Sequence, residues 1–121
     1  MNSRKKQNYS LDQLSDCIKI LSADAVEAAN SGHPGLPLGF SDVMTCLAFE
    51  FLKFNPHDPQ WFNRDRLILS AGHGSMLIYS FLYLTGYKDF SLNDIKNFRQ
   101  LKSKAAGHPE HHLFAAIETT T

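Results

Sequence analysis

The chain has 121 residues, 43% hydrophobic and 20% charged, which fits one ordinary globular domain and shows no compositional sign of disorder. Its 12 basic residues balance its 12 acidic ones, so no overall field favours nucleic acid or an anionic membrane as a partner. The most apolar stretches, 43–54 and 76–84, are interrupted by charge or too short to cross a bilayer, so we expect no membrane partner.

The first ten residues predict a polar tail, and the structured part is expected over residues 11–121. The tail carries three basic residues, and no apolar core of a signal peptide follows it, which predicts a cytoplasmic protein. Cys17 and Cys46 both fall within apolar helical patterns. We therefore expect buried, reduced thiols rather than a disulfide or a pair of metal ligands.

A first helix is predicted from Leu11 to Ala29. Ser10 followed by Gln13 fits a capping box, and Asn30-Ser31-Gly32 stops the run. Apolar residues recur at helical spacing between these signals: Leu11, Leu14, Ile18, Leu21, Ala25 and Ala29. This helix should therefore bury one face.

A second helix is expected to open at Ser41 and Asp42 and to run through Phe54, where Asn55-Pro56 ends it. Its residues are apolar nearly all round, so it requires cover on several sides. Residues 55–66 then read as a surface loop pinned by the aromatic pair at 61 and 62.

An α/β fold is indicated by the segment that follows. Leu67–Leu69 is predicted to be a short buried strand, 70–75 a glycine turn, and Met76–Thr85 a helix closed by Gly86. Ser91 and Asp94 are expected to cap a further helix through Leu101, and Leu113–Thr121 is expected to begin another strand.

Three of the six histidines lie in glycine or proline loops. They are His33 in Gly-His-Pro-Gly, His73 in Gly-His-Gly-Ser and His108 in Gly-His-Pro-Glu. Glycine lets a ligand approach the backbone, and imidazole can accept or donate a proton near neutrality. On pattern alone such a histidine can equally be a turn residue.

The loop around His73 lies between the predicted strand and the amino end of a helix. Free backbone N–H groups and the helix dipole at such a position favour an anion, so Gly72, His73 and Gly74 are candidates to bind a phosphate. The glycine spacing matches neither a Walker A loop nor a dinucleotide fingerprint.

A zinc site is the rival interpretation of the same histidines. His33, His73, His108 and the pair at 111 and 112 supply nitrogen ligands. No two of these residues form the short helical pair that usually anchors zinc, and neither cysteine lies in a matching loop, so we name no metal ligand.

Several motifs, taken in order, resemble the amino-terminal part of transketolases. They are Asp24-Ala25-Val26, the run from Ala29 to Gly35, Gly72-His73-Gly74-Ser75-Met76-Leu77, Gly107-His108-Pro109-Glu110 and Glu118-Thr119-Thr120-Thr121. Segments 84–87 and 98–101 also match between the motifs. The resemblance extends from about Leu11 onward, which marks this part as a helix-rich leading portion of a thiamine diphosphate-binding parallel-sheet domain.

The resemblance implies a reaction and a role for each loop histidine. Transketolases move a two-carbon ketol group from a ketose phosphate to an aldose phosphate in the pentose phosphate pathway, using thiamine diphosphate with Mg²⁺ or Ca²⁺. His33 resembles the residue that contacts substrate hydroxyls and assists proton transfer, and His73 the one beside the cofactor diphosphate. His108 resembles the histidine that binds the donor sugar near the reacting carbon, while His57, His111 and His112 are expected at the surface.

The family pattern continues past Thr121 with a Gly-Pro-Leu-Gly turn, the metal-binding motif and an activating glutamate. The family site also lies between the two subunits of a homodimer. We therefore expect the chain alone to be inactive and to be marginally stable or to associate. It is read as part of a shortened or split enzyme whose remainder is a partner; the alternative is a non-catalytic interaction module.

Overall fold

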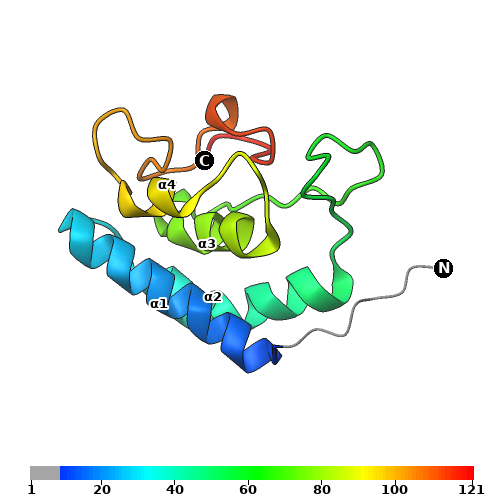
Figure 1. Cartoon of the computed structure of the whole chain (residues 1–121), viewed down its shortest axis with the longest axis horizontal. Helices are drawn as coiled ribbons and strands as arrows, with labels where there is room; N and C mark the ends of the chain where they lie inside the picture. The colour runs from blue at the N-terminus through cyan, green and yellow to red at the C-terminus, as the bar shows by residue number, and fades with distance from the viewer. Residues whose placement is uncertain (1–8) are drawn as a thin grey trace.

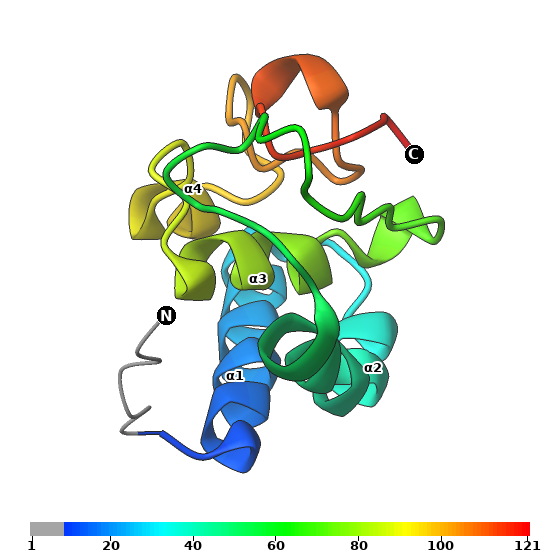
Figure 2. The same ribbon diagram turned by 90° about the vertical axis from the view of Figure 1, so that its right-hand side faces the viewer.

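A computed structural model describes residues 9–121, so most of the predicted polar tail lies outside the described residues. Its elements, in chain order, are α1 (Leu11–Ala29), α2 (Gly35–Cys46), the π-helical turn η1 (Leu47–Phe51), the 3-10 turn η2 (Gly72–Gly74), α3 (Met76–Thr85), α4 (Leu92–Lys96) and the 3-10 turn η3 (His111–Leu113). Helices α1 and α2 lie on one side of α3, and the irregular segments of the second half lie on the other (Figures 1 and 2).

Residues 9–121 are helix-rich, as expected for the leading part of the domain, and the expected parallel sheet is not shown within them. Neither Leu67–Leu69 nor Leu113–Thr121 forms a strand. Main-chain hydrogen bonds to a neighbouring strand define a sheet, and the described backbone makes none at 67–69. The local apolar pattern is therefore present without the partner that a strand needs.

The prediction for α1 is confirmed at both ends. The Ser10 side chain accepts from the Gln13 N–H and the Gln13 side chain accepts from the Ser10 N–H, which completes the capping box. Asn30 ends the helix in the left-handed conformation with φ 49°. The capping box and the left-handed C-cap each involve residues within one helical turn, so a local sequence pattern can predict them.

The second helix begins earlier and ends earlier than predicted. It starts at Gly35, because Pro37 lies in the first turn, where a missing N–H costs nothing. Ser41 serves not as a cap but as a buried contact whose Oγ lies 2.9 Å from Ser15 Oγ on α1. Helical structure ends with η1, and Leu52 is already extended.

The core is built around α3, which crosses α1 and α2 and is confirmed as predicted, with Gly86 closing it at φ 86°. Tyr79 is fully buried. Its ring stacks on Phe90 at 5.1 Å between centroids and also meets Phe98 and Phe114. This aromatic cluster ties the second half of the chain to α3 without a sheet.

The helix opened by Ser91 and Asp94 has the predicted capping box but ends at Lys96 rather than Leu101. The chain turns instead, since Arg99 adopts a positive φ of 59° and its N–H donates to the Ala105 carbonyl at 2.8 Å. This turn directs residues 105–109 back toward α3.

Three predictions about burial are wrong. Cys17 and Cys46 are exposed rather than buried, because each lies on the outer face of its helix. The aromatic pair does not anchor the 55–66 loop, since Trp61 is 36% and Phe62 89% exposed. Polar side chains hold this loop instead, as described below.

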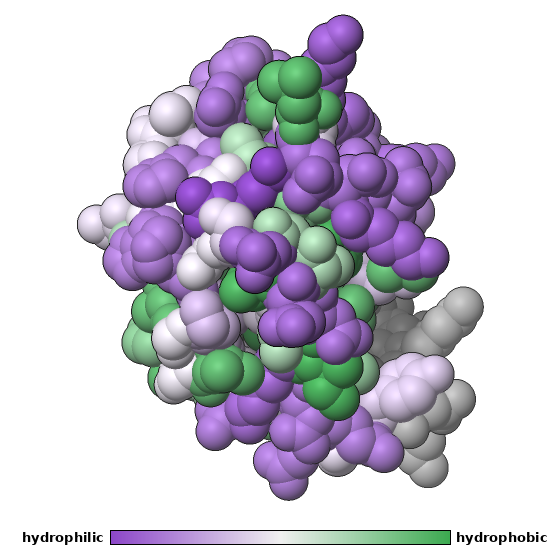
Figure 3. Space-filling model, turned by 90° about the vertical axis from the view of Figure 1, so that its left-hand side faces the viewer, coloured by the Kyte–Doolittle hydropathy of each residue, from purple (hydrophilic) through white to green (hydrophobic). Residues whose placement is uncertain are grey.

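The α2–η1 helix lacks the full cover that its composition requires. Val43 and Phe51 are 44% and 69% exposed. A groove of about 180 Å³ also lies between α2, residues 67–69 and α3, with Phe40 and Ile68 among its lining residues. The face seen from the left of Figure 1 is mainly hydrophilic with scattered apolar groups (Figure 3). No helix within residues 9–121 has both the length and the apolar character that a membrane span requires.

Candidate functional site

Two of the three loop histidines meet in the structure. The rings of His33 and His73 lie 5.2 Å apart between centroids with an interplanar angle of 84°, an edge-to-face contact. His33 is placed by the turn between α1 and α2, where Gly32 adopts φ +134° and an added Cβ would lie 3.0 Å from the Phe98 ring. Both imidazoles are exposed, so they can reach a ligand from solvent.

The glycines on either side of His73 are required by close packing. A Cβ on Gly74 would lie 2.5 Å from Leu36 Cδ2, and one on Gly72 would lie 2.6 Å from the main-chain carbon of Thr121. Their own N–H groups donate to the carbonyls of Ala71 and Ser70. These glycines thus let three segments close around the turn, and their N–H groups are engaged locally.

His108 is linked to the His73 turn through Thr121. Its Nδ1 lies 2.9 Å from the main-chain oxygen of Thr121, the residue that packs on Gly72. A main-chain oxygen can only accept a hydrogen bond, so Nδ1 carries the proton in this contact. In the neutral form of this tautomer, Nε2 is the acceptor nitrogen.

The loop that carries His108 is fastened to α3 by two hydroxyl groups. Ser75 donates to the Gly107 carbonyl at 2.9 Å, and Tyr79 donates to the Ala106 carbonyl at 2.8 Å. Burial raises the pKa of Tyr79 well above its ordinary value, so the phenol stays a donor at neutral pH. The start of α3 therefore positions both the His73 turn and the His108 loop.

In the structure, the rings of His33 and His73 are in direct contact. Gly72 and His108 both contact Thr121, which links the third histidine to the same turn. A family model for the transketolase thiamine diphosphate binding domain matches residues 10–121. The chain belongs to this family.

Individual relatives agree with the family assignment. The transketolase of Nostoc sp. is 55% identical over 113 residues, covering 93% of this chain and 17% of that protein. Transketolase 1 of Escherichia coli is 54% identical over all 121 residues, again 17% of its length. This chain therefore spans about a sixth of the length of these relatives.

Solved transketolase structures share the fold. The Campylobacter jejuni enzyme superposes with a TM-score of 0.87 at 52% identity, covering 92% of this chain and 17% of that one. A Pichia stipitis transketolase in complex with sedoheptulose 7-phosphate gives the same TM-score at 47% identity, covering 92% and 16%. The helix-rich arrangement described above is thus the arrangement of the corresponding transketolase segment.

Metal ligands are not gathered in this part of the transketolase fold. Among residues 9–121, no three His, Cys, Asp or Glu side chains lie close enough together to hold an ion. His111 and His112 are exposed and lie on η3. His111 Nδ1 contacts the Ile117 carbonyl and His112 lies 3.4 Å from Glu110, so the zinc interpretation gains no ligand cluster from them.

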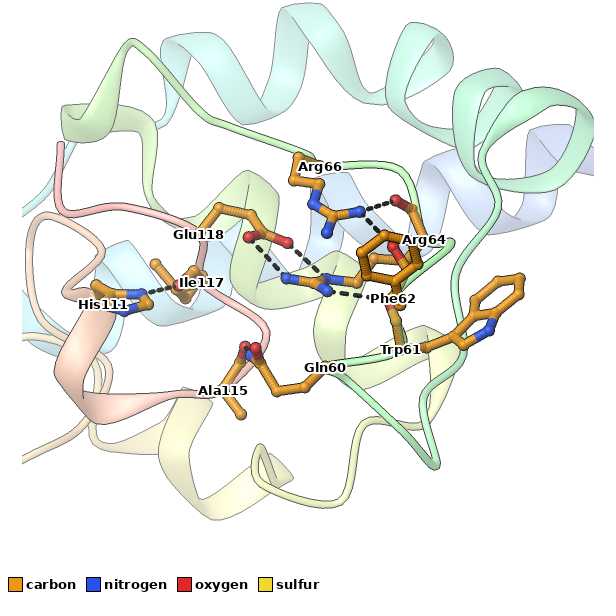
Figure 4. Close-up of polar contacts among 9 residues, drawn as sticks. All are labelled: Gln60, Trp61, Phe62, Arg64, Arg66, His111, Ala115, Ile117 and Glu118. Carbon is orange, nitrogen blue, oxygen red and sulfur yellow. Dashed lines mark hydrogen bonds and ion pairs between the residues drawn. The ribbon is translucent and has the colours of Figure 1, made fainter.

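An ion pair that the sequence does not predict holds residues 115–118 against the 55–66 loop. Arg64 and Glu118 form two hydrogen bonds side by side, at 2.9 and 3.0 Å (Figure 4). Glu118 belongs to a motif that gives no hint of its partner, and no local pattern marks Arg64. The two residues are 54 positions apart, and no local pattern links them.

Proposed function

We propose that residues 11–121 supply one wall of a thiamine diphosphate site for ketol transfer. The observation that carries the proposal is the convergence of His33, His73 and His108 on one place, through the His33–His73 contact and the shared Thr121 segment. A structural role alone would not require three exposed imidazoles at packed glycine turns. The family assignment supports the choice of cofactor.

The residues fit the cofactor at the turn before α3. His73 lies at the amino end of a ten-residue helix, where the dipole stabilises negative charge, so its imidazole would contact the diphosphate. Gly72 and Gly74, whose N–H groups donate within the turn, would shape the turn that receives it. When bound, thiamine diphosphate supplies the nucleophilic carbon that carries the two-carbon unit. Mg²⁺ or Ca²⁺ would be held by residues outside this chain.

The other two histidines are proposed to handle the sugar. His33 would contact substrate hydroxyls and exchange protons with them, since its exposed ring lies beside His73. His108 would orient the donor sugar phosphate near the reacting carbon through its free Nε2. The Pichia stipitis relative was solved with sedoheptulose 7-phosphate, which supports sugar phosphates as ligands of this chain as well.

We propose that the wall is completed by the remaining portion of a transketolase, as a homodimer, in the pentose phosphate pathway. The chain spans about 17% of its relatives' length, so these 121 residues are not expected to transfer ketol groups alone. A cytoplasmic location stays a prediction from the sequence.

Calorimetric titration of the 121-residue chain with thiamine diphosphate and Mg²⁺ tests the cofactor role. We expect weak binding that His73→Ala removes, while His57→Ala, an exposed histidine in the 55–66 loop, leaves it unchanged. Equal binding by both variants would overturn the role of His73. A parallel ketol-transfer assay should show no turnover, and turnover by the chain alone would show that the site needs nothing further.

A non-catalytic interaction module is the second candidate, favoured by the exposed apolar residues of α2 and η1, among them Val43 and Phe51. It predicts a stable complex whose formation is insensitive to thiamine diphosphate. Dependence of that complex on the cofactor would favour the enzyme.

A further inference from the structure

The Arg64–Glu118 pair is a two-point contact shielded from solvent. Arg64 Nε lies 2.9 Å from Glu118 Oε1, and Nη2 lies 3.0 Å from Oε2. The side chains are only 10% and 16% exposed. A planar guanidinium that meets both carboxylate oxygens fixes the direction of its partner as well as its distance.

Arg64 is itself held rigidly by its own loop. Its Nη1 donates to the Trp61 carbonyl at 2.9 Å, and pairing with Glu118 raises the pKa of the guanidinium. Gln60, from the same loop, donates to the Ala115 carbonyl (Figure 4). The 60–64 portion of the loop is therefore a fixed support on which residues 115–118 rest.

The support extends from Glu118 to the candidate site through three residues. Thr120 Oγ1 accepts from the His111 N–H at 2.9 Å, and the Thr121 N–H donates to the Pro109 carbonyl at 3.3 Å. The main-chain oxygen of Thr121 then accepts from His108 Nδ1. No strand in residues 9–121 holds this segment, so the ion pair and these few hydrogen bonds keep it in place.

We infer that Arg64 and Glu118 are positioning residues that hold the Thr121 oxygen against His108, so that the imidazole is kept as the Nδ1–H tautomer with Nε2 free. The relevance of this tautomer rests on the proposed function, in which Nε2 faces the donor sugar. The contacts among Arg64, Glu118, Thr121 and His108 do not depend on that function. An unpositioned neutral imidazole would exchange between its two tautomers, and only one of them has Nε2 as the acceptor.

Nitrogen-15 NMR of the histidine rings tests the inference without any cofactor. In the 121-residue chain with an amidated C-terminus, Thr121 offers an uncharged main-chain oxygen. At about pH 9, where imidazole side chains are neutral, we expect His108 to show one tautomer, with the proton on Nδ1. Glu118→Gln keeps the shape but removes one charge-assisted contact, and Arg64→Lys keeps the charge but loses the two-point geometry. In both variants the His108 ring nitrogens should shift toward averaged values.

Glu27→Gln is the matched control, because it makes the same chemical change on an exposed position of α1. It should leave the His108 signals as in the parent chain. Far-UV circular dichroism identifies the variants that remain folded. If Glu118→Gln does not fold, Arg64→Lys decides the question.

An unchanged Nδ1–H signal in a folded Glu118→Gln or Arg64→Lys chain would overturn the inference, as would an Nε2–H tautomer in the parent chain. Titration of the same samples with thiamine diphosphate separates the two proposals. A parent chain that shows the fixed tautomer but binds no cofactor refutes the proposed function and leaves the positioning role standing.

Discussion

At the scale of single residues, the candidate site depends on glycines, which have no side chain, as much as on its histidines. Gly72 and Gly74 both touch neighbouring segments so closely that a methyl group has no room. The neighbour of Gly72 is backbone, which cannot rotate away, whereas the neighbour of Gly74 is the Leu36 side chain. Gly72 is therefore the less replaceable of the two.

Gly72→Ala should destabilise the chain by about 1–3 kcal/mol, the usual cost of overpacking, because the new Cβ meets Thr121. Gly39→Ala is the matched control, since nothing lies within 4 Å of an added Cβ there and the position is inside α2. It should stabilise by roughly 0.5–1 kcal/mol. Urea unfolding at equilibrium measures both, and equal effects of the two changes would contradict the contact.

Tyr79 predicts an alkaline dependence of stability. Its folded pKa lies above the ordinary value of 10.0, mainly because of burial. The unfolded chain therefore loses this proton first, and stability falls as the pH rises above about 10. Tyr79→Phe loses the hydrogen bond to Ala106, which costs about 1–2 kcal/mol at neutral pH, but escapes that alkaline contribution.

Unfolding measured at about pH 7 and about pH 10.5 should show the gap between the parent chain and Tyr79→Phe narrowing with pH. Tyr83→Phe retains Tyr79 and should keep the parent's alkaline loss. A gap that widens with pH would mean that Tyr79 ionises more easily when folded.

At the scale of elements, α1 and α2 meet through polar contacts rather than apolar packing alone. Ser15 contacts both Ser41 and Asp42, and Lys19 lies 3.5 Å from Asp42. The hydrogen bond from Ser15, and then the charge of Lys19, hold the pKa of Asp42 below its ordinary value of 3.8. The ionised Asp42 carboxylate therefore contributes to the contact between these two helices.

Asp42→Asn should make stability less sensitive to acid. A carboxylate with a lowered folded pKa contributes stability above its unfolded pKa and loses it as the pH falls through about 3.8 and below. The urea midpoint of the parent chain should therefore drop more steeply than that of Asp42→Asn between about pH 6 and pH 3. Asp89→Asn, an exposed control, should follow the parent, and identical acid limbs for all three would refute the contribution.

The elements also show which features the sequence makes predictable. Capping boxes such as Ser10 with Gln13 span four residues, so the pattern and the structure coincide. The strand expected at 67–69 and the partners of Arg64 depend on residues far along the chain, and no local pattern contains them. The loop histidines were predicted from local chemistry, but their contacts through Thr121 required the fold.

At the scale of the whole molecule, the apolar surface is distributed unevenly. The groove between α2 and α3 has Phe40 and Ile68 at 42% and 54% exposure, and Val43, three residues after Phe40 on α2, is 44% exposed. Apolar side chains gathered on one face favour association. We expect this face to drive the predicted association of the chain.

Ile68→Ser should reduce self-association, because it replaces an apolar group lining the groove with a polar one while leaving the buried core in place. Leu101→Ser is the control, since Leu101 is 91% exposed but lies in the loop after α4. Sedimentation velocity over a concentration series should show less oligomer for Ile68→Ser only. A parent chain that sediments as a monomer at every concentration would contradict the expectation.

The contact between Gly72 and Thr121 also bears on the order in which the chain folds. It joins residues 49 positions apart (121 − 72 = 49), whereas α1 and α2 are adjacent helices that can pair as soon as both exist. Closing a long loop costs entropy before its contacts compensate. In refolding, amides of α1 and α2 should thus gain hydrogen-exchange protection before the hydrogen bond from His108 to Thr121 forms. The contacts of Thr121 with Gly72 and His108 should also open without global unfolding. A ligand that contacts both the His73 turn and the His108 loop would then oppose this local opening. It should slow the hydrogen exchange of residues 107–121 more than that of α1.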